Sequence, residues 1–148
     1  MWVPKKTKYK KMHKGRISLI IGKRNRKLTV GKVAIIATQA AIILPSQLEQ
    51  LKKKSKFLLK KHGYIQFHIF PHFQKTQKAI GLRMGKGKGV VADYFCRVKM
   101  LQVICEFKSV QLTNNFLLHV AKQCKKNLAF STAIIFKTNN TNTILWKK

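Results

Sequence analysis

The sharpest local pattern in this 148-residue chain is a short segment in which glycine alternates with basic residues. It consists of Arg83, Met84, Gly85, Lys86, Gly87, Lys88 and Gly89. The glycines have no Cβ atoms that would hold the backbone away from a bulky polyanion, and the cations supply charge beside them. The segment matches neither G-x-x-x-x-G-K-[ST] nor G-x-G-x-x-G. It indicates a loop that can enter between phosphates, although a solvated hairpin tip has the same composition.

A second basic cluster lies near the N-terminus and has no apolar periodicity, which favours an extended arm over residues 1–27. Its cations and rings are the residues that we expect to bind RNA: Lys5, Lys6, Lys8, Tyr9, Lys10, Lys11, His13, Lys14 and Arg16. The lysines can neutralise phosphates, and the two rings can stack on exposed bases. A solvated tail is the alternative interpretation.

The charge balance excludes several classes of protein. The chain has 32 Lys+Arg against 3 Asp+Glu, a formal net charge of +29. Like charges oppose a compact state, so the compensating anions come from a partner: a nucleic acid first, an anionic membrane surface second. The acids Glu49, Asp93 and Glu106 are too few and scattered for paired-carboxylate catalysis or hard-metal binding. We therefore expect that the protein is not an enzyme and that it binds no cofactor.

The cysteines and histidines do not form a recognisable metal site. Cys96, Cys105 and Cys124 are odd in number and lack a C-x-x-C spacing, so we expect buried, reduced thiols. His68 and His72 lie close together, but no cysteine or acid is near them in sequence. No apolar run reaches the roughly 18–20 residues of a membrane span, so we expect no membrane partner.

The clearest predicted element is a helix over residues 47–62, with a leucine stripe and lysines over most of its remaining surface. Ser46 and Glu49 have the spacing of a capping box, and Gly63 suits a left-handed stop. Pro45 could instead be the first helical residue. Either start buries the same face.

The other elements alternate between strand and helix patterns. Strands are expected within 28–44, at 64–70, around 79–84, and at 90–98, 101–107 and 130–137. A second helix is expected at 112–126, capped by Thr113 or Asn114. Because no βαβ unit repeats, the pattern favours an α+β domain over residues 28–137, followed by a polar tail at 138–148.

Both basic motifs resemble those of the L-sixteen family of large-subunit ribosomal proteins, the bacterial and organellar relatives of eukaryotic ribosomal protein L-ten. Order and spacing agree from residue 4 to about residue 137. Gln47-Leu48-Glu49 with the following lysine pair is similar to the family's Gln-Ile-Glu helix, and Phe70-Pro71 ends a strand where the family's strand ends. Glu106 stands where the family has Phe/Tyr-Glu.

The resemblance implies a hammerhead-type fold, a sandwich of a mixed or antiparallel sheet with two helices, a basic arm and a projecting Gly/Lys loop. It implies a structural constituent of the large ribosomal subunit that binds rRNA near the central protuberance and the peptidyl transferase region. It further implies that the protein helps to position A-site tRNA, with P-site tRNA and neighbouring large-subunit proteins as further partners, without catalytic activity and without homo-oligomers.

Departures from the family pattern leave some points open. Residues 39–44 are apolar where the family is basic, a Pro-Gly turn is missing near Met100-Leu101, and the early glycine segment is only Val30-Gly31. With abundant Ile, Phe, Lys and Asn, whose codons are A/T-rich, and no presequence before the arm, this divergence indicates an organelle-encoded protein. We expect it in the mitochondrial matrix, in the mitochondrial ribosome, with a plastid or a bacterial cytoplasm as alternatives.

The alternative function is a nucleoid-type DNA-binding protein, although the lysine-rich helix lacks the arginines that read bases.

Overall fold

The computed structural model describes residues 2–13, 15, 17, 28–85, 87–109, 111–137 and 142–143. Its elements are β1 (Val33–Ala37), β2 (Ala41–Ile43), α1 (Pro45–Leu59), β3 (Gly63–Phe67), β4 (Phe73–Gln77), β5 (Val90–Val98), β6 (Val103–Ser109), α2 (Asn114–Lys125), β7 (Thr132–Lys137) and β8 (Asn142–Thr143). Two helices with two antiparallel sheets make an α+β fold, which confirms the predicted class. Most of the boundary between arm and domain, and most of the tail, lies outside the described residues, so these limits stay predictions.

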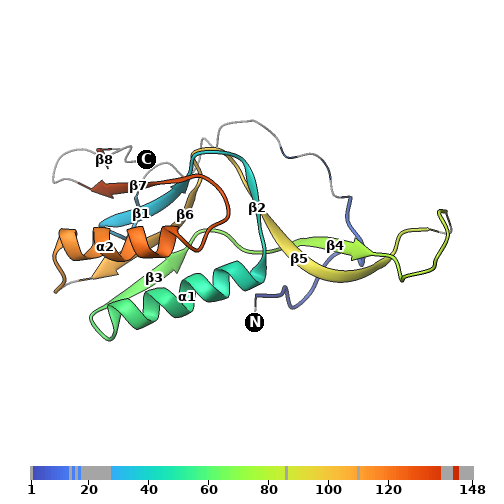
Figure 1. Cartoon of the computed structure of the whole chain (residues 1–148), viewed down its shortest axis with the longest axis horizontal. Helices are drawn as coiled ribbons and strands as arrows, with labels where there is room; N and C mark the ends of the chain where they lie inside the picture. The colour runs from blue at the N-terminus through green and yellow to red at the C-terminus, as the bar shows by residue number, and fades with distance from the viewer. Residues whose placement is uncertain are drawn as a thin grey trace.

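The larger sheet has the strand order β3-β6-β1-β7-β8, and both helices lie against one of its faces (Figure 1). Its central strand β1 is buried over all five residues, which suits its run of β-branched and small side chains. Val33 and Ile35 point to the core under the helices. Ala34 and Ile36 face a second, smaller cluster that includes Leu28. The expected core strand within 28–44 is therefore confirmed.

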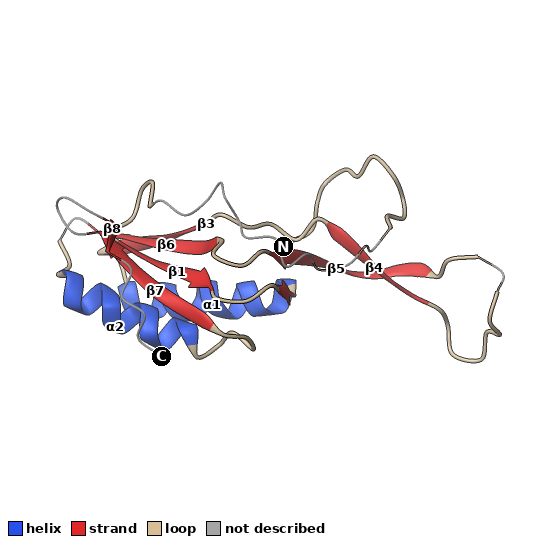
Figure 2. Cartoon of the chain, turned by 90° about the horizontal axis from the view of Figure 1, so that it is seen from above, coloured by secondary structure: helices blue, strands red, loops and turns tan. Residues whose placement is uncertain are grey.

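The smaller sheet has the order β2-β5-β4 and carries the glycine segment away from the core. One half of β5 pairs with β2, and the other half pairs with β4 to form a hairpin that extends beyond both helices (Figure 2). Residues 78–89 connect the two strands at its far end. The predicted projection of the glycine segment is thus present. The strand expected around 79–84 is wrong, because pairing stops at Gln77 and Val90 and leaves no partner for those residues.

Helix α1 begins earlier than the main prediction and uses a different cap. Pro45 is its first residue, which was the alternative start, since the ring of proline already fixes a helical φ. With that start, Gln47 occupies the third helical position, and its Oε1 accepts from the backbone N–H of Leu44 at 3.0 Å. The capping box expected from Ser46 and Glu49 is therefore wrong.

The end of α1 also differs from the prediction. Lys60, not Gly63, takes the positive φ of 51° after the last helical residue. Gly63 begins β3, where a Cβ atom would lie 2.9 Å from the carbonyl oxygen of Lys108. Glycine is needed at this position for close strand approach rather than for helix termination.

Two further local predictions have clear outcomes. Thr113 caps α2, and its Oγ1 accepts from the backbone N–H of Phe116 at 3.4 Å. The missing Pro-Gly turn is replaced by a turn between Lys99 and Gln102, in which Leu101 takes a φ of 61°. The apolar stretch at 39–44 forms β2 against β5, and Ile43 is fully buried there.

Candidate nucleic-acid interface

The structure brings the two predicted basic segments together. The Nζ of Lys11 donates to the carbonyl oxygen of Lys88 at 2.5 Å, and the Nζ of Lys88 donates to the carbonyl oxygen of Met12. These residues are more than seventy positions apart in sequence. The arm and the glycine segment therefore belong to one surface. We call the exposed side chains of residues 5–13 and 78–89 the arm–hairpin surface.

Further contacts hold the arm along the smaller sheet. The side-chain Nε2 of Gln74 in β4 donates to the carbonyl oxygen of Tyr9 at 3.1 Å. A Cβ atom on Gly15, whose φ is +59°, would lie 3.1 Å from a guanidinium nitrogen of Arg97. That guanidinium in turn lies 4.1 Å from the centre of the Phe73 ring. The arm is thus held through its backbone, at the carbonyl oxygen of Tyr9 and at Gly15, which lies against the Arg97 guanidinium.

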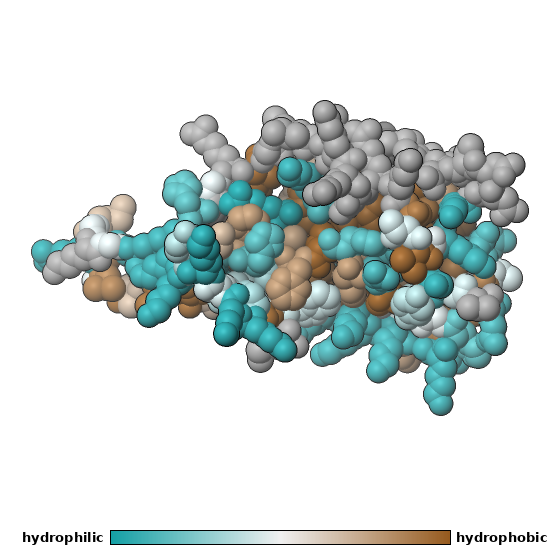
Figure 3. Space-filling model, turned by 180° about the vertical axis from the view of Figure 1, so that it is seen from behind, coloured by the Kyte–Doolittle hydropathy of each residue, from teal (hydrophilic) through white to brown (hydrophobic). Residues whose placement is uncertain are grey.

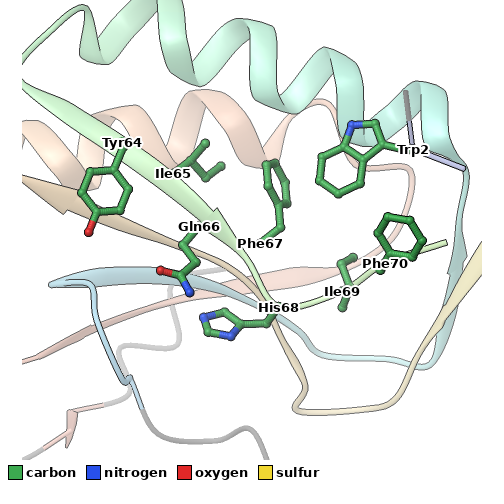
Figure 4. A pocket seen from close by; sticks show the side chains of 8 residues that line it. All are labelled: Trp2, Tyr64, Ile65, Gln66, Phe67, His68, Ile69 and Phe70. Atoms are coloured by element: carbon green, nitrogen blue, oxygen red, sulfur yellow. The ribbon is translucent and has the colours of Figure 1, made fainter. Parts of the chain in front are cut away.

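Trp2 fixes the start of the arm against the other sheet. Its ring lies edge-on to Phe67, with 5.0 Å between the ring centres, and 6.1 Å from the ring of Phe70. Figure 4 shows these rings at the end of a groove that follows residues 64–70. The aromatic contact ties the N-terminal residues to the end of β3, so the arm crosses from one sheet to the other.

Most of the predicted RNA-binding residues are described, and all of those are exposed except Gly89, which is partly buried. The exposed arm residues and loop residues are Lys5, Lys6, Lys8, Tyr9, Lys10, Lys11, His13, Arg83, Met84, Gly85, Gly87 and Lys88. Lys14, Arg16 and Lys86 lie outside the described residues. The sequence has no acid within 1–32 or 78–89, so no carboxylate in either segment offsets this charge. The arm–hairpin surface is strongly electropositive as a result.

Glycine is needed at positions 85 and 89 for two different structural reasons. Gly85 has a φ of +88°, and a Cβ atom there would meet nothing within 4 Å. Its carbonyl oxygen accepts from the Nζ of Lys78 at 2.6 Å, which closes the loop on itself. A Cβ atom on Gly89 would lie 2.4 Å from the carbonyl oxygen of Gln77. Gly85 therefore supplies a turn that other residues rarely adopt, while Gly89 permits the two strands to meet.

The loop and the start of β5 also present apolar side chains, of which Met84 belongs to the predicted segment and the others were not predicted. Ile80, Leu82 and Val90 are 103%, 62% and 70% exposed, and Met84 is 96% exposed. Figure 3 shows apolar and hydrophilic side chains gathered together on the projecting hairpin. The alternation of Ile80, Leu82 and Met84 was the available signal, but it also fits a strand. In a loop without a facing strand, these side chains are free to contact bases or another apolar surface.

Glu106 is a buried carboxylate whose surroundings were not predicted from the sequence. It is 1% exposed, and its carboxylate accepts from the backbone N–H groups of Thr29 at 3.1 Å, Val30 at 2.8 Å and Gly31 at 2.7 Å. The Nε2 of His68 lies 2.9 Å from its Oε1. Burial opposes ionisation, but the hydrogen bonds from Gly31, Val30 and Thr29 and the nearby imidazole outweigh it, so the pKa of Glu106 is lowered. The carboxylate of Glu106 thus holds the segment before β1 against β6 through hydrogen bonds.

The thiols and the histidines show no site of their own among the described residues. Cys96, Cys105 and Cys124 are buried and free, as predicted. Burial raises the pKa of Cys96 and of Cys124 to about 11, and that of Cys105 well above its ordinary value, so these thiols are poor nucleophiles. In the described ranges, no three His, Cys, Asp or Glu side chains gather as metal ligands would. The helices of the same ranges include none long and apolar enough to cross a membrane.

Comparisons with known proteins agree with the sequence resemblance. The sequence profile of the family described as Ribosomal protein L16p/L10e matches residues 4–135. The protein named large ribosomal subunit protein uL16 from Acinetobacter baumannii is 32% identical over 141 residues, which is 93% of this chain and 98% of that protein. The protein of the same name from Acinetobacter baylyi has the same identity and coverage. With a match over nearly its whole length, the chain belongs to the ribosomal protein L16p/L10e family.

Proposed function

We propose that this chain is a structural protein of the large ribosomal subunit, and that it binds large-subunit rRNA through the arm–hairpin surface. The observation that carries the proposal is the joining of Lys11 and Met12 to Lys88. It unites the two most basic segments of a chain with a formal charge of +29. A continuous surface of exposed lysines without acids fits the phosphate backbone of a folded RNA.

The hairpin tip supports a second part of the proposal, contact with tRNA at the A site, with the P-site tRNA as a further partner. The loop at the end of the hairpin extends beyond the helices (Figure 2), and Cβ atoms on Gly81, Gly85 and Gly87 would meet nothing within 4 Å. Its apolar side chains Ile80 and Met84 are almost fully exposed, so they can rest on unstacked bases while the exposed Arg83 faces phosphates. The family resemblance directs this tip toward the peptidyl transferase region.

Sedimentation tests the ribosomal assignment. The full chain, produced with a tag in cells whose own family member is depleted, should sediment with the large subunit and remain there at raised salt. Neighbouring large-subunit proteins should then cross-link to it. Equal retention on double-stranded DNA and on structured rRNA fragments, without association with the subunit, would favour the nucleoid alternative. No described helix offers arginines for reading base pairs, which argues against that alternative.

A charge-reversal variant tests the role of the tip. Arg83→Glu combined with Lys86→Glu should slow the accommodation of aminoacyl-tRNA in ribosomes that contain the variant, without preventing its assembly. The matched control is Lys122→Glu, an exposed lysine on α2, which should leave accommodation unchanged. Normal accommodation with the tip variant would refute contact with tRNA and leave the rRNA assignment standing.

The cellular location is a separate part of the proposal. The composition favours A/T-rich codons, which supports an organellar gene and a place in the mitochondrial ribosome. The relatives named above are bacterial, so a plastid or bacterial origin remains the competing assignment. Fractionation of the source cells, followed by immunodetection of the chain in mitochondrial large subunits, decides between these locations.

A further inference from the structure

Phe57 on α1 is an aromatic side chain that the fold does not use. It is 79% exposed, whereas Leu48, Leu51 and Leu59 of the same helix are fully or almost fully buried. Nine residues separate Leu48 from Phe57, which is two and a half turns of helix, so the two side chains lie on opposite faces. The core therefore gives no reason for a phenyl ring at this position.

The neighbours of Phe57 are lysines. Lys53 and Lys54 precede it by four and three residues, so they lie beside it on the helix surface, and Lys60 follows at the helix end. The Nζ of Lys54 donates to the Oδ1 of Asn127, in the turn after α2, at 3.2 Å, and Lys53 and Lys60 are exposed. Within the described residues the ion pair found is that of His68 with Glu106, so none of these lysines has a carboxylate within ion-pair distance; Glu49 lies one helical turn before Lys53.

We propose that Phe57 is a stacking platform for an unpaired RNA base, with Lys53 and Lys60 on the phosphates to either side of that base. The inference rests on the proposed binding of rRNA and adds a second contact to it. The C-terminal end of α1 lies away from the projecting hairpin (Figure 1), so this site is distinct from the arm–hairpin surface. The protein would then hold RNA at both of its ends.

The surroundings of the ring favour RNA over a protein or a lipid surface. Charged side chains are depleted at the centres of protein interfaces, whereas cations beside an exposed ring are the usual arrangement for single-stranded nucleic acid. Membrane-surface helices need a broad apolar face. The apolar face of α1 is already buried against the sheet and α2, which leaves a single ring for the outside.

Binding to a large-subunit rRNA transcript tests the proposal with the full chain. Phe57→Ala should weaken binding by about 5- to 140-fold, the range for loss of one stacked base. Because stacking is not ionic, the slope of log K against log salt should not change. Phe57→Trp should retain wild-type affinity. Lys53→Gln should instead reduce the slope by about 0.7–0.9.

The matched control is Phe116→Ala on α2, an exposed phenylalanine without lysines three or four residues away. It should bind as the wild type does. The Phe57 variants should melt at the wild-type temperature, because this ring is 79% exposed, whereas Phe116 is 40% exposed and its binding is measured at a temperature at which Phe116→Ala is shown to be folded. Equal affinity of Phe57→Ala and wild type overturns the proposal, and so does a photoreactive phenylalanine at position 57 that cross-links to protein in the assembled subunit. If the wild type itself binds no rRNA, the proposed function fails first, so the two failures are distinguishable.

Discussion

At the residue scale, Glu106 has a structural role in a chain almost devoid of acids. It is a buried carboxylate that receives three backbone N–H groups from residues 29–31 and faces His68. In a protein with so much positive charge, one of the three acids is thus committed to holding the segment before β1 against β6.

We expect Glu106→Gln to lower the free energy of unfolding by about 1–3 kcal/mol. The amide keeps one acceptor oxygen but turns N–H groups toward backbone donors, which leaves at least one buried donor unsatisfied. Urea denaturation followed by circular dichroism measures the change. Asp93→Asn, at an exposed carboxylate of β5, is the control and should change stability far less. Equal losses in both variants would contradict the role of the buried network.

The lowered pKa of Glu106 gives the stability a defined pH dependence. Because the unfolded carboxyl takes up a proton at its ordinary pKa of 4.5, before the folded one does, its contribution is complete above that value. It is lost as the pH falls through the lower pKa of the folded state. The difference in unfolding free energy between wild type and Glu106→Gln should therefore be constant above about pH 5.5 and shrink in acid. A difference that grows as the pH falls would mean that the folded pKa is raised instead.

At the scale of elements, the β4–β5 hairpin depends on a close approach at its closed end. We expect Gly89→Ala to disturb the pairing there, because the added methyl group would lie 2.4 Å from the carbonyl oxygen of Gln77. Amide hydrogen exchange should accelerate at Thr76, Gln77 and Val91 while the residues of β1 stay protected. Gly85→Ala is the comparison: its Cβ meets open space, so it costs only the strain of a positive φ, roughly 1–2 kcal/mol, confined to the loop. Unchanged exchange in Gly89→Ala would show that the loop adapts freely.

Local sequence patterns were sufficient for elements whose own residues decide their structure. β5 occupies the predicted 90–98, and Thr113 caps α2, because alternation and capping are properties of neighbouring residues. Local patterns failed to predict structure that depends on a partner far away in the sequence. β4 at 73–77 is a polar strand that exists because β5 pairs with it, and Gly63 is required by Lys108 on another strand.

The candidate site was likewise predictable only in part from the sequence. The residues of the arm and the loop could be chosen from composition, because clustered lysines and glycines are visible in a short window. Their union could not, since the hydrogen bonds of Lys11 with Lys88 and of Gln74 with Tyr9 join residues 77 and 65 positions apart. Phe57 was missed for another reason: helical periodicity already places it opposite the leucine stripe, but a single aromatic residue among lysines forms no motif that would single it out.

At the scale of the whole molecule, the arm should contribute to RNA affinity mainly through charge. We expect Lys5→Gln with Lys6→Gln to reduce the slope of log K against log salt by roughly 1.4–1.8, about 0.7–0.9 for each phosphate that a lysine no longer neutralises. Filter binding to an rRNA transcript between low and moderate salt measures the slope. The control is Lys122→Gln on α2, which should leave the slope unchanged. An unaltered slope in the arm variant would place these lysines away from phosphates.

The charge of +29 also makes the isolated protein less stable than its core allows. Because salt screens repulsion between exposed lysines, the melting temperature should rise as NaCl is added, by about 2–4 °C for each kcal/mol recovered. Lys52→Glu on α1 should have the same effect at low salt, since it removes repulsion and places a carboxylate four residues before Lys56. Its advantage should vanish at high salt, and it should bind rRNA more weakly than the wild type. A melting temperature that falls with NaCl, or a variant that gains both stability and affinity, would show that self-repulsion is not what limits the free protein. A gain in stability together with a loss of RNA affinity is what the proposed function predicts, because bound RNA would then be the source of the balancing negative charge.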